Sequence, residues 1–294
     1  MKNILHTKRF ANEWKELLID LYSYKKEGVF IVIRNLFYRK NYIYLPLLSY
    51  TDKNHQDFKK ISIELLNDNY QARVLDFHDR NFSENDMVTM RLNIFNKDYS
   101  EIYKKSFKVK CRNQIQKSLK SDLIFKFGSG NLLNDFYNIF SETMHRYGTP
   151  VFTERLFSLI LEKFNSGIII VYKDQIPVAG GIYIIDSKLM IVPWAASKKS
   201  FSKFCPNHLM YSNLIKLAIQ NSCEIFDFGR SQYDGNTFKF KSQWGALPFK
   251  IITLRKKEID IYSRYSLLSK IWSNLPRKVV NYIGPIICKY IPDL

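Results

Sequence analysis

The 294-residue sequence is poor in cysteine and has no long apolar run. Its four cysteines form no C-x-x-C pair and have no histidine at ligand spacing, so neither a disulfide framework nor a zinc site is expected, and no metal cofactor. A membrane-spanning helix needs about 18 consecutive apolar residues, whereas the longest apolar stretches, 167–172 and 176–185, are much shorter. We therefore expect neither a disulfide-rich secreted domain nor a membrane-spanning protein.

Several catalytic signatures are also missing. The sequence has no G-x-x-x-x-G-K-[ST], G-x-G-x-x-G, H-E-x-x-H or G-x-S-x-G. The sequence therefore gives no motif evidence for P-loop hydrolysis, dinucleotide redox chemistry, zinc proteolysis or α/β-hydrolase chemistry. The N-terminal residues MKNILHTKRFANEW carry charges where a signal peptide needs a continuous apolar segment, so we expect a cytoplasmic protein.

Apolar and basic residues are abundant instead. The sequence is 46% hydrophobic and 15% aromatic, which excludes a disordered protein. Lys and Arg number 45 against 27 Asp and Glu, a formal net charge of +18. This charge attracts polyanions, but nucleic acid, anionic lipid and pyrophosphate-linked substrates would all satisfy it.

Hydrophobic periodicity predicts a mixed α/β fold with helices and strands in alternation. In the second half we expect strands over 167–173, 176–185, 188–194, 224–228 and 249–254, the first three as a meander, and helices over 132–145, 153–164 and 207–221, the last capped by Asn207. In the first half we expect strands over 29–36, 42–48, 71–77 and 87–94, and helices over 10–22, 56–66 and, as one basic helix, 99–119.

The two α/β halves suggest a duplicated architecture. They meet at Phe127-Gly-Ser-Gly-Asn131, which predicts domains over 1–127 and 128–258, followed by a basic amphipathic tail over 259–294. Ten basic residues against three acidic ones lie between Lys241 and Leu294, interleaved with large apolar side chains. Such a tail suits a membrane surface, or it packs its apolar stripe on the body and leaves the basic face solvated.

One stretch stands out as a candidate catalytic segment. A buried strand from Glu224 runs into a Gly-Arg-Ser turn and then an aromatic and basic segment, an arrangement that α/β folds use for their sites. Arg230 and the adjacent Ser231 are candidates to hold a phosphate or carboxylate, and Lys239 or Lys241 to stabilise an oxyanion in acyl transfer. Asp227, in the strand, is a further catalytic candidate. The alternative is that the cations lie on the surface of a short helix.

A second candidate is the basic helix. From Glu101 to Lys126 eight basic residues stand against two acidic ones. Donors within two turns of each other could bind a pyrophosphate or an RNA backbone, or the face is simply solvated; these donors are Lys110, Arg112, Asn113 and Lys117. His145 and His208 are candidate bases or helix-face hydrogen bonders. The tryptophans Trp194 and Trp244 line a pocket or belong to the core.

Six ordered motifs resemble those of one known family. They are Arg112-Asn113-Gln-Ile-Gln-Lys117, Tyr147-Gly148-Thr149-Pro150-Val151, Trp194-Ala-Ala-Ser, Pro206-Asn207-His-Leu-Met-Tyr211, Phe226-Asp227-Phe228-Gly229-Arg230-Ser231 and Phe238-Lys-Phe-Lys-Ser-Gln-Trp244-Gly245. Together they resemble the FemAB-like branch of the GNAT acyltransferase superfamily. The tail, with Trp272-Ser-Asn-Leu-Pro276 and Ile283-Gly284-Pro285, resembles members linked to exopolysaccharide and PEP-CTERM systems.

The resemblance implies tandem GNAT-like domains that transfer an acyl or aminoacyl group onto an amine. Fem ligases take the aminoacyl group from aminoacyl-tRNA, add it to a peptidoglycan precursor, and use a lysine in the segment equivalent to 238–244. On that pattern Lys239 or Lys241 is catalytic, and Arg230 or the 112–117 helix holds phosphates; Asn207 and Trp194 fall in further substrate-binding motifs. GNAT enzymes that use coenzyme A cradle its pyrophosphate on a glycine-containing loop, but the loop over 195–207 has no glycine. The donor therefore stays open among acyl-CoA, acyl carrier protein and aminoacyl-tRNA.

Three functions are therefore expected as alternatives. The first is N-acyl or aminoacyl transfer to an amine-bearing, glycan- or lipid-linked precursor of the cell envelope or an extracellular polysaccharide, near the inner membrane face. The second is a tRNA-dependent Fem-type ligase acting on a peptidoglycan precursor. The third is a non-catalytic protein that binds a polyanionic glycan carrier, a lipid head group or RNA.

Overall fold

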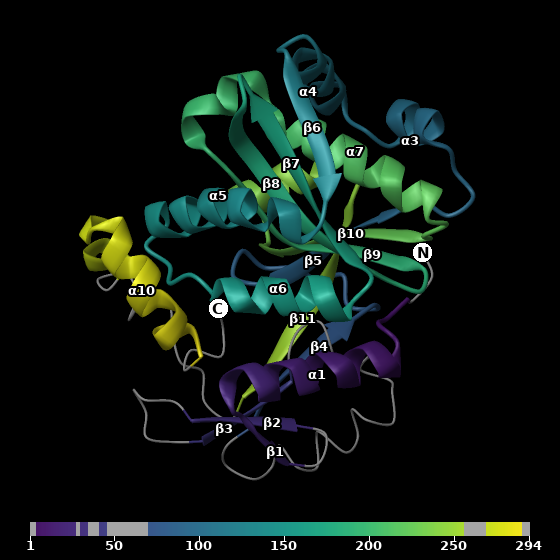
Figure 1. Cartoon of the computed structure of the whole chain (residues 1–294). Helices are drawn as coiled ribbons and strands as arrows, with labels where there is room; N and C mark the ends of the chain where they lie inside the picture. Colours follow the sequence, from purple (N-terminus) through teal and green to yellow (C-terminus); the bar gives the residue numbers. More distant parts are fainter. Residues whose placement is uncertain (1–3, 28–29, 35–40, 46–69, 256–268, 290–294) are drawn as a thin grey trace. The chain divides into compact units, whose positions relative to one another are not determined.

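A computed structural model describes residues 4–27, 30–34, 41–45, 70–255 and 269–289 (Figure 1). Their contacts divide the chain into two compact units. The first unit comprises residues 1–4, 77–140 and 160–250, and the second comprises 5–76, 141–159 and 251–294.

The two units do not follow the expected domain boundaries. The boundary expected after residue 127 falls inside a strand, β6 (Leu123–Gly128), of the first unit. The reason is long-range pairing: β5 (Met87–Asn93) is antiparallel to β10 (Ile225–Gln232), so a strand of the first half belongs to the sheet of the second. The boundary after 258 lies outside the described residues.

The first unit contains a mixed sheet, which confirms the expected α/β class. Besides β5, β6 and β10 it includes β7 (Ser166–Lys173), β8 (Ile176–Asp186), β9 (Leu189–Ser197) and the first residues of β11 (Leu247–Arg255). The strand order is β11-β5-β10-β9-β8-β7-β6. Strands β6 to β9 pair antiparallel in sequence order, which confirms the expected meander, and β9 pairs with β10 in parallel. Asp174 and Gln175, at the β7–β8 turn, both have positive φ (50° and 64°), as a tight hairpin turn requires.

The first unit's sheet has helices on both faces. Helix α7 (Pro206–Gln220) packs against β6, β7, β8 and β9, and α5 (Leu133–Arg146) begins in this unit (Figure 1). Two consecutive glycines of β8 identify the helix that covers each face, because the Cβ positions of successive strand residues point to opposite sides of the sheet. The Cβ position of Gly180 lies 3.5 Å from Phe136 of α5, and that of Gly181 lies 3.4 Å from Met210 of α7. The remaining helical segments are α6 (Glu154–Lys163), which ends in this unit, the 3-10 turns η2 (Gly130–Leu132) and η3 (Lys199–Phe204), and α8 (Asn236–Ser242).

Strands β9 and β10 separate partway along their length. Their parallel pairing covers Leu189–Ile191 with Ile225–Asp227. Beyond it β9 stays paired with β8 and β10 stays paired with β5, with a register shift between Asp227 and Arg230. Gly229, inside this shift, has φ +76°, and a Cβ there would lie 3.0 Å from the carbonyl oxygen of Val192. The β9–β10 ladder therefore ends at Ile191 and Asp227, while the backbone of Gly229 still lies close to Val192.

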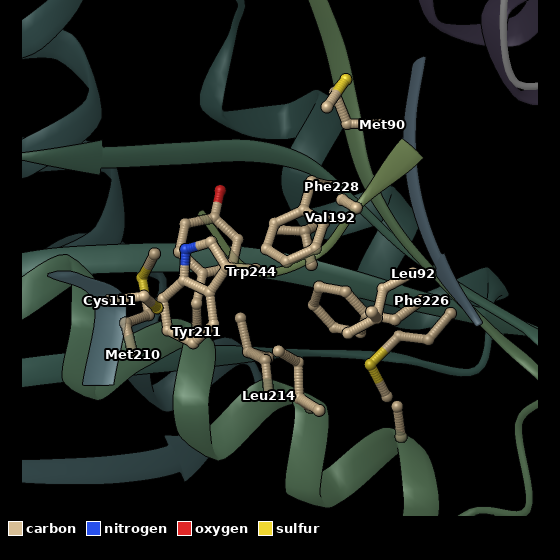
Figure 2. Packing of buried hydrophobic residues seen from close by; sticks show 14 of the residues in the cluster. Met90, Leu92, Cys111, Val192, Met210, Tyr211, Leu214, Phe226, Phe228 and Trp244 are labelled. Carbon is tan, nitrogen blue, oxygen red and sulfur yellow. The ribbon is translucent and has the colours of Figure 1, made fainter. Parts of the chain in front are cut away.

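The core of this unit is aromatic around Trp244, which is fully buried. Its ring packs against Phe107 at a centroid distance of 5.0 Å, and against Phe228 and Tyr211 at 6.0 and 6.1 Å. Figure 2 shows Trp244 beside Tyr211 and Phe228, with Cys111 of the neighbouring helix close by. The four cysteines are buried and free, as expected from their spacing.

The expected single helix over 99–119 is two helices, α3 (Tyr99–Lys105) and α4 (Val109–Leu119). The break lets Phe107 enter the core beside Trp244. The backbone N–H of Lys108 donates to the carbonyl of Gln243 (2.8 Å), which ties the break to the segment after α8. A local pattern of helix-forming residues could not reveal this contact.

Three other expectations also need correction. Helix α7 begins at Pro206 with Cys205, not Asn207, at its N-cap, because Cys205 takes the left-handed conformation (φ 58°). The strand expected over 224–228 continues to Gln232. Strand β6 was not expected, although Leu123, Ile124, Phe125 and Phe127 are strand-favouring residues; it lies at the edge of the sheet and is largely exposed.

The second unit is also mixed. Helix α1 (Lys8–Tyr22) is capped by Thr7, whose side chain accepts from the N–H of Phe10 at 3.2 Å. Strands β1 (Lys25–Glu27), β2 (Phe30–Arg34) and β3 (Asn41–Leu45) pair antiparallel, and β3 pairs in parallel with β4 (Tyr70–Asp76). Helix α10 (Arg277–Cys288) lies in the expected tail. The helix expected over 56–66 lies outside the described residues.

We expect Gly245→Ala to destabilise the protein. Gly245 has φ +76°, and a Cβ would lie 2.6 Å from the carbonyl oxygen of Ser106, which is backbone and cannot rotate away. The loss should be about 2 kcal/mol or more in the free energy of unfolding, measured by urea titration. Gly130→Ala is the matched control, because a Cβ at Gly130 has nothing within 4 Å. Equal losses in the two variants would contradict the packing described for Gly245.

Candidate functional site

A buried ammonium group lies against β10 just beyond the last β9–β10 pair. Lys241 projects from α8, which follows β10 after the turn at Gly235, and only 4% of the residue is exposed. Its Nζ donates to the carbonyl oxygens of Arg230 (2.7 Å) and Gly229 (3.0 Å). Burial lowers the pKa of Lys241 to about 7, against the opposing charge of Asp227, and Arg230 lowers it further.

The ammonium group keeps one donor beyond these contacts. A lysine ammonium has three N–H groups, and the hydrogen bonds formed in the described part of the chain use two. A ligand oxygen could accept the third. In a buried site a charged donor of this kind acts more strongly than in water, because the dielectric constant is lower.

The two candidate lysines differ sharply. The side chain of Lys239 is 59% exposed and its Nζ forms an ion pair with Asp234 at 3.2 Å, which is also half exposed. Lys241, two residues on, is on the opposite side of the same short helix and points inward. The geometry that suits a catalytic cation is therefore found at Lys241.

The carboxylate of Asp227 links β10 to β5 and to the Gly229 turn through hydrogen bonds. Its Oδ1 accepts from the Thr89 hydroxyl (2.5 Å) and from the N–H of Gly229 (2.8 Å), and its Oδ2 accepts from Nε of Arg91 at 2.7 Å. All of these side chains are buried. Asp227 was expected as a catalytic residue, but this arrangement uses both oxygens to hold β5 and the Gly229 turn together. Thr89 and Arg91 were not identified from the sequence, since they precede Asp227 by more than 130 residues.

Basic side chains of α4 lie near the N-terminus of α7. Lys110, Gln114 and Lys117 share one face of α4 by their spacing, and Gln114 accepts a hydrogen bond from the thiol of Cys205. Burial raises the pKa of Cys205, and the charge of Lys117 opposes this. Burial lowers the pKa of His208 to about 4, and the charge of Lys110 lowers it further. Lys110 and Lys117 are therefore close enough to influence the first turn of α7.

Only part of the backbone at the start of α7 has an amide free for a ligand. Pro206 has no N–H, and the N–H groups of His208 and Leu209 already donate to the carbonyl of Cys205 at 3.0 and 3.4 Å. The 3-10 turn η3 carries Lys199 and Lys203. The loop over 195–207 has no glycine, so the glycine-loop cradle that coenzyme A would use is not formed here.

The other expected site residues are distributed around these features. Arg112 donates to the carbonyl of Phe107 and so closes the α3–α4 turn, and Asn113 is exposed on α4. Arg230 is half-buried, and its carbonyl accepts from both Lys241 and the Ser231 hydroxyl (2.9 Å). Nδ2 of Asn207 donates to Ser197 Oγ at 3.0 Å.

The aromatic and histidine candidates divide between strand, core and tail. Trp194 is half-buried on β9, whereas Trp244 is a core residue and lines no surface. The ring of His208 stacks on Trp244 at 5.6 Å, and its Nε2 has no partner among the described residues. In the second unit, Nε2 of His145 bonds the carbonyl of Leu275 at 2.9 Å.

A family comparison decides the fold of this part of the chain. Residues 105–242, which include α4, α7, β10 and Lys241, match the family described as "Acetyltransferase (GNAT) domain". This stretch is GNAT-like. The parallel pair β9–β10, followed by the separation of the two strands, lies inside the GNAT-like stretch.

Solved structures extend the likeness to most of the chain. FemX has a TM-score of 0.60 at 13% identity, over 91% of this chain and 94% of that one. The C-terminal domain of a putative lysylphosphatidylglycerol synthetase from Agrobacterium fabrum has 0.53 at 10% identity, over 82% and 84%. L-PGS from Bacillus licheniformis has 0.52 at 10% identity, over 94% and 100%. No curated protein matches the sequence significantly. At these identities the likeness concerns the fold alone.

Membrane-spanning helices and metal-binding clusters are both absent from the described residues. No helix in that part of the chain is both long and apolar enough to cross a bilayer. No group of three or more His, Cys, Asp or Glu side chains is arranged to hold a metal ion among those residues.

We expect acid to destabilise the protein partly through His208. In the folded state its pKa is about 4, below the ordinary value of 6.5, so the unfolded chain binds a proton that the folded protein does not. The stabilisation is present above pH 6.5 and is lost as the pH falls to 4, by about 2–3 kcal/mol. Urea titrations at several pH values should therefore show a smaller loss in His208→Gln.

Phe136→Leu is the control for this experiment. Phe136 is buried against Phe140 on the face of the sheet opposite α7 and does not titrate, so its substitution should lower stability without changing the slope with pH. Parallel losses in the wild type and His208→Gln between pH 6.5 and 4 would contradict the shift.

Proposed function

We propose that this protein is a GNAT-fold transferase that moves an acyl or aminoacyl group onto an amino group of a cell-envelope or extracellular-polysaccharide precursor. The observation that carries the proposal is the buried ammonium of Lys241 with its remaining donor, at the point where β9 and β10 separate. The GNAT-like match over residues 105–242 gives the reaction class. The FemAB-like fold supports an envelope precursor as the acceptor.

The proposed step is direct attack of the acceptor amine on the activated acyl carbon. A C–N bond forms, the carbonyl oxygen becomes an oxyanion, and the bond to the leaving thiolate or ribose oxygen then breaks. The amine loses a proton, and the leaving group gains one. Lys241 donates its third N–H to the oxyanion, and alignment of the two substrates supplies the rest of the acceleration. Asp227 acts as a positioning residue, since it fixes the Gly229 turn whose carbonyl orients Lys241.

Lys110 and Lys117 are proposed to hold the phosphates of the donor. Both are exposed on α4 and lie near the start of α7. A thioester donor would supply a good leaving group, and its pyrophosphate would rest on these cations in place of a glycine loop.

A specific observation favours a second candidate, a Fem-type ligase that uses aminoacyl-tRNA. In the first turn of α7, Pro206 has no N–H and the N–H of His208 is already bonded, so few amides remain for coenzyme A, while the α4 cations suit a nucleic-acid backbone. The names of two structural neighbours, FemX and a lysylphosphatidylglycerol synthetase, agree with aminoacyl transfer. Tight binding of a polyanion without turnover would instead support the third alternative, a binding protein.

The donor can be identified by thermal shift. A ligand present at 100 times its dissociation constant stabilises the folded state by about 2.7 kcal/mol, which raises Tm by several degrees. Acetyl-CoA, longer acyl-CoA thioesters and charged tRNA would be compared. A shift with a thioester supports the first candidate, and a shift with charged tRNA alone supports the second.

The same assay tests the phosphate contacts. Lys110→Ala/Lys117→Ala should weaken binding of the active donor by about tenfold or more. Lys105→Ala/Lys188→Ala is the matched control, because it removes the same charge from two other exposed positions. Equal weakening in both double variants would show a general charge effect and contradict the assignment to α4.

With the donor known, single-turnover assays test Lys241. We expect Lys241→Gln to lower kcat by about 10²- to 10³-fold with a small change in KM, because the oxyanion loses its charged donor. The glutamine amide can still donate to a backbone carbonyl and so support the turn. Lys239→Gln, at the exposed neighbour, should retain full activity.

A pH profile adds an independent test of the same residue. The ammonium form of Lys241 is lost as the pH rises through its pKa of about 7. The wild-type rate should therefore have a descending limb near pH 7, and the residual rate of Lys241→Gln should lack it. Full activity in Lys241→Gln would contradict the assignment of Lys241 as the donor to the oxyanion.

A further inference from the structure

Helix α10 is packed on its own unit along one face. Val280, Gly284 and Cys288 are buried and spaced by four residues, so they form one line along the helix. The Cβ position of Gly284 lies 3.0 Å from the backbone nitrogen of Val151, which shows how closely the helix approaches. The guanidinium of Arg277 donates to Ser141 Oγ at 3.0 Å.

The outward face of α10 is apolar as well. Tyr282 is 77% exposed, Ile286 50% and Val279 39%. Residues 278, 282 and 286 are each two positions from the buried line, which is a rotation of about 200° and so the opposite side of the helix. A surface helix normally turns charged or polar side chains outward. Here the outward line holds Lys278 followed by Tyr282 and Ile286, and Ile271, just before the helix, is 53% exposed.

The charged side chains of the segment that carries this surface have one sign. Residues 269–289 include four basic side chains and no acidic one. Lys270 and Lys278 are exposed, whereas Arg277 lies 3.8 Å from Glu142. Two copies of the chain that met through this face would bring like charges together. A bilayer with anionic head groups would instead attract the cations and accept the apolar side chains, with the tyrosine ring at the interface.

We propose that the outward face of α10, formed by Lys278, Val279, Tyr282 and Ile286, binds the surface of an anionic membrane. The helix lies in the plane of the interface, Tyr282 and Ile286 enter the head-group boundary, and Lys270 and Lys278 contact anionic head groups. The inference is independent of the transferase proposal, because it concerns no residue of the Lys241 site.

Vesicle co-sedimentation of the full chain tests the proposal. The vesicles are phosphatidylcholine alone and phosphatidylcholine with one third phosphatidylglycerol. We expect binding to the anionic vesicles at low salt that weakens as salt is raised. Tyr282→Ser/Ile286→Ser should reduce this binding by about tenfold or more, and Lys270→Ala/Lys278→Ala should reduce it about as strongly.

Controls separate the surface from the fold and from exposed apolar side chains elsewhere. Ile124→Ser/Ile176→Ser removes two exposed isoleucines of the other unit, 64% and 43% exposed, and should leave binding unchanged. Because Tyr282 and Ile286 are exposed, their substitution should not lower the thermal midpoint. The proposal is wrong if wild type binds both vesicles equally or neither, or if the isoleucine control loses binding to the same extent. A concentration-dependent dimer that Tyr282→Ser/Ile286→Ser abolishes would also overturn it.

Discussion

The buried ion pair between Arg91 and Asp227 is the contact on which the candidate site depends. Asp227 lies where β10 leaves β9, and it is joined to β5 by Arg91 and Thr89 and to its own strand by the N–H of Gly229. Loss of Arg91 would leave the buried carboxylate of Asp227 uncompensated, at a cost of about 3–5 kcal/mol. The same contacts orient the carbonyls of Gly229 and Arg230, which hold Lys241. The ion pair between Arg91 and Asp227 in the sheet thus fixes the position of the Lys241 ammonium group, which helix α8 carries.

This connection also explains how a lysine can be buried at that position. Burial disfavours the ammonium form, whereas the charge of Asp227 favours it. Two carbonyl oxygens satisfy part of its hydrogen-bonding capacity. The result is an amine whose protonation is poised near neutral pH, a property common among groups that take part in catalysis.

The elements that the sequence predicted well are those determined by local patterns. The three strands of the meander have continuous apolar runs and short polar turns, and they were found where expected. The division of the basic segment into α3 and α4 depends on Phe107 and Trp244, which are far apart in the sequence. For the same reason Lys239 and Lys241 looked alike in the motif, since only the fold shows that one pairs with Asp234 in solvent and the other with backbone carbonyls. Asp227 was recognised by its motif, but its role depends on partners from β5 that no short pattern connects to it.

Strand β5 is synthesised well before β10, the strand with which it pairs. All five central residues of β5 are buried, and β10, which pairs with it, starts at Ile225, 132 residues after Asn93. At a typical elongation rate of 5–20 residues per second, β5 therefore emerges from the ribosome roughly 7–25 s before its partner strand. Throughout that interval the nascent chain exposes an apolar segment that can pair with other chains. Binding by a ribosome-associated chaperone would be most valuable to this protein while the stretch between β5 and β10 is being translated.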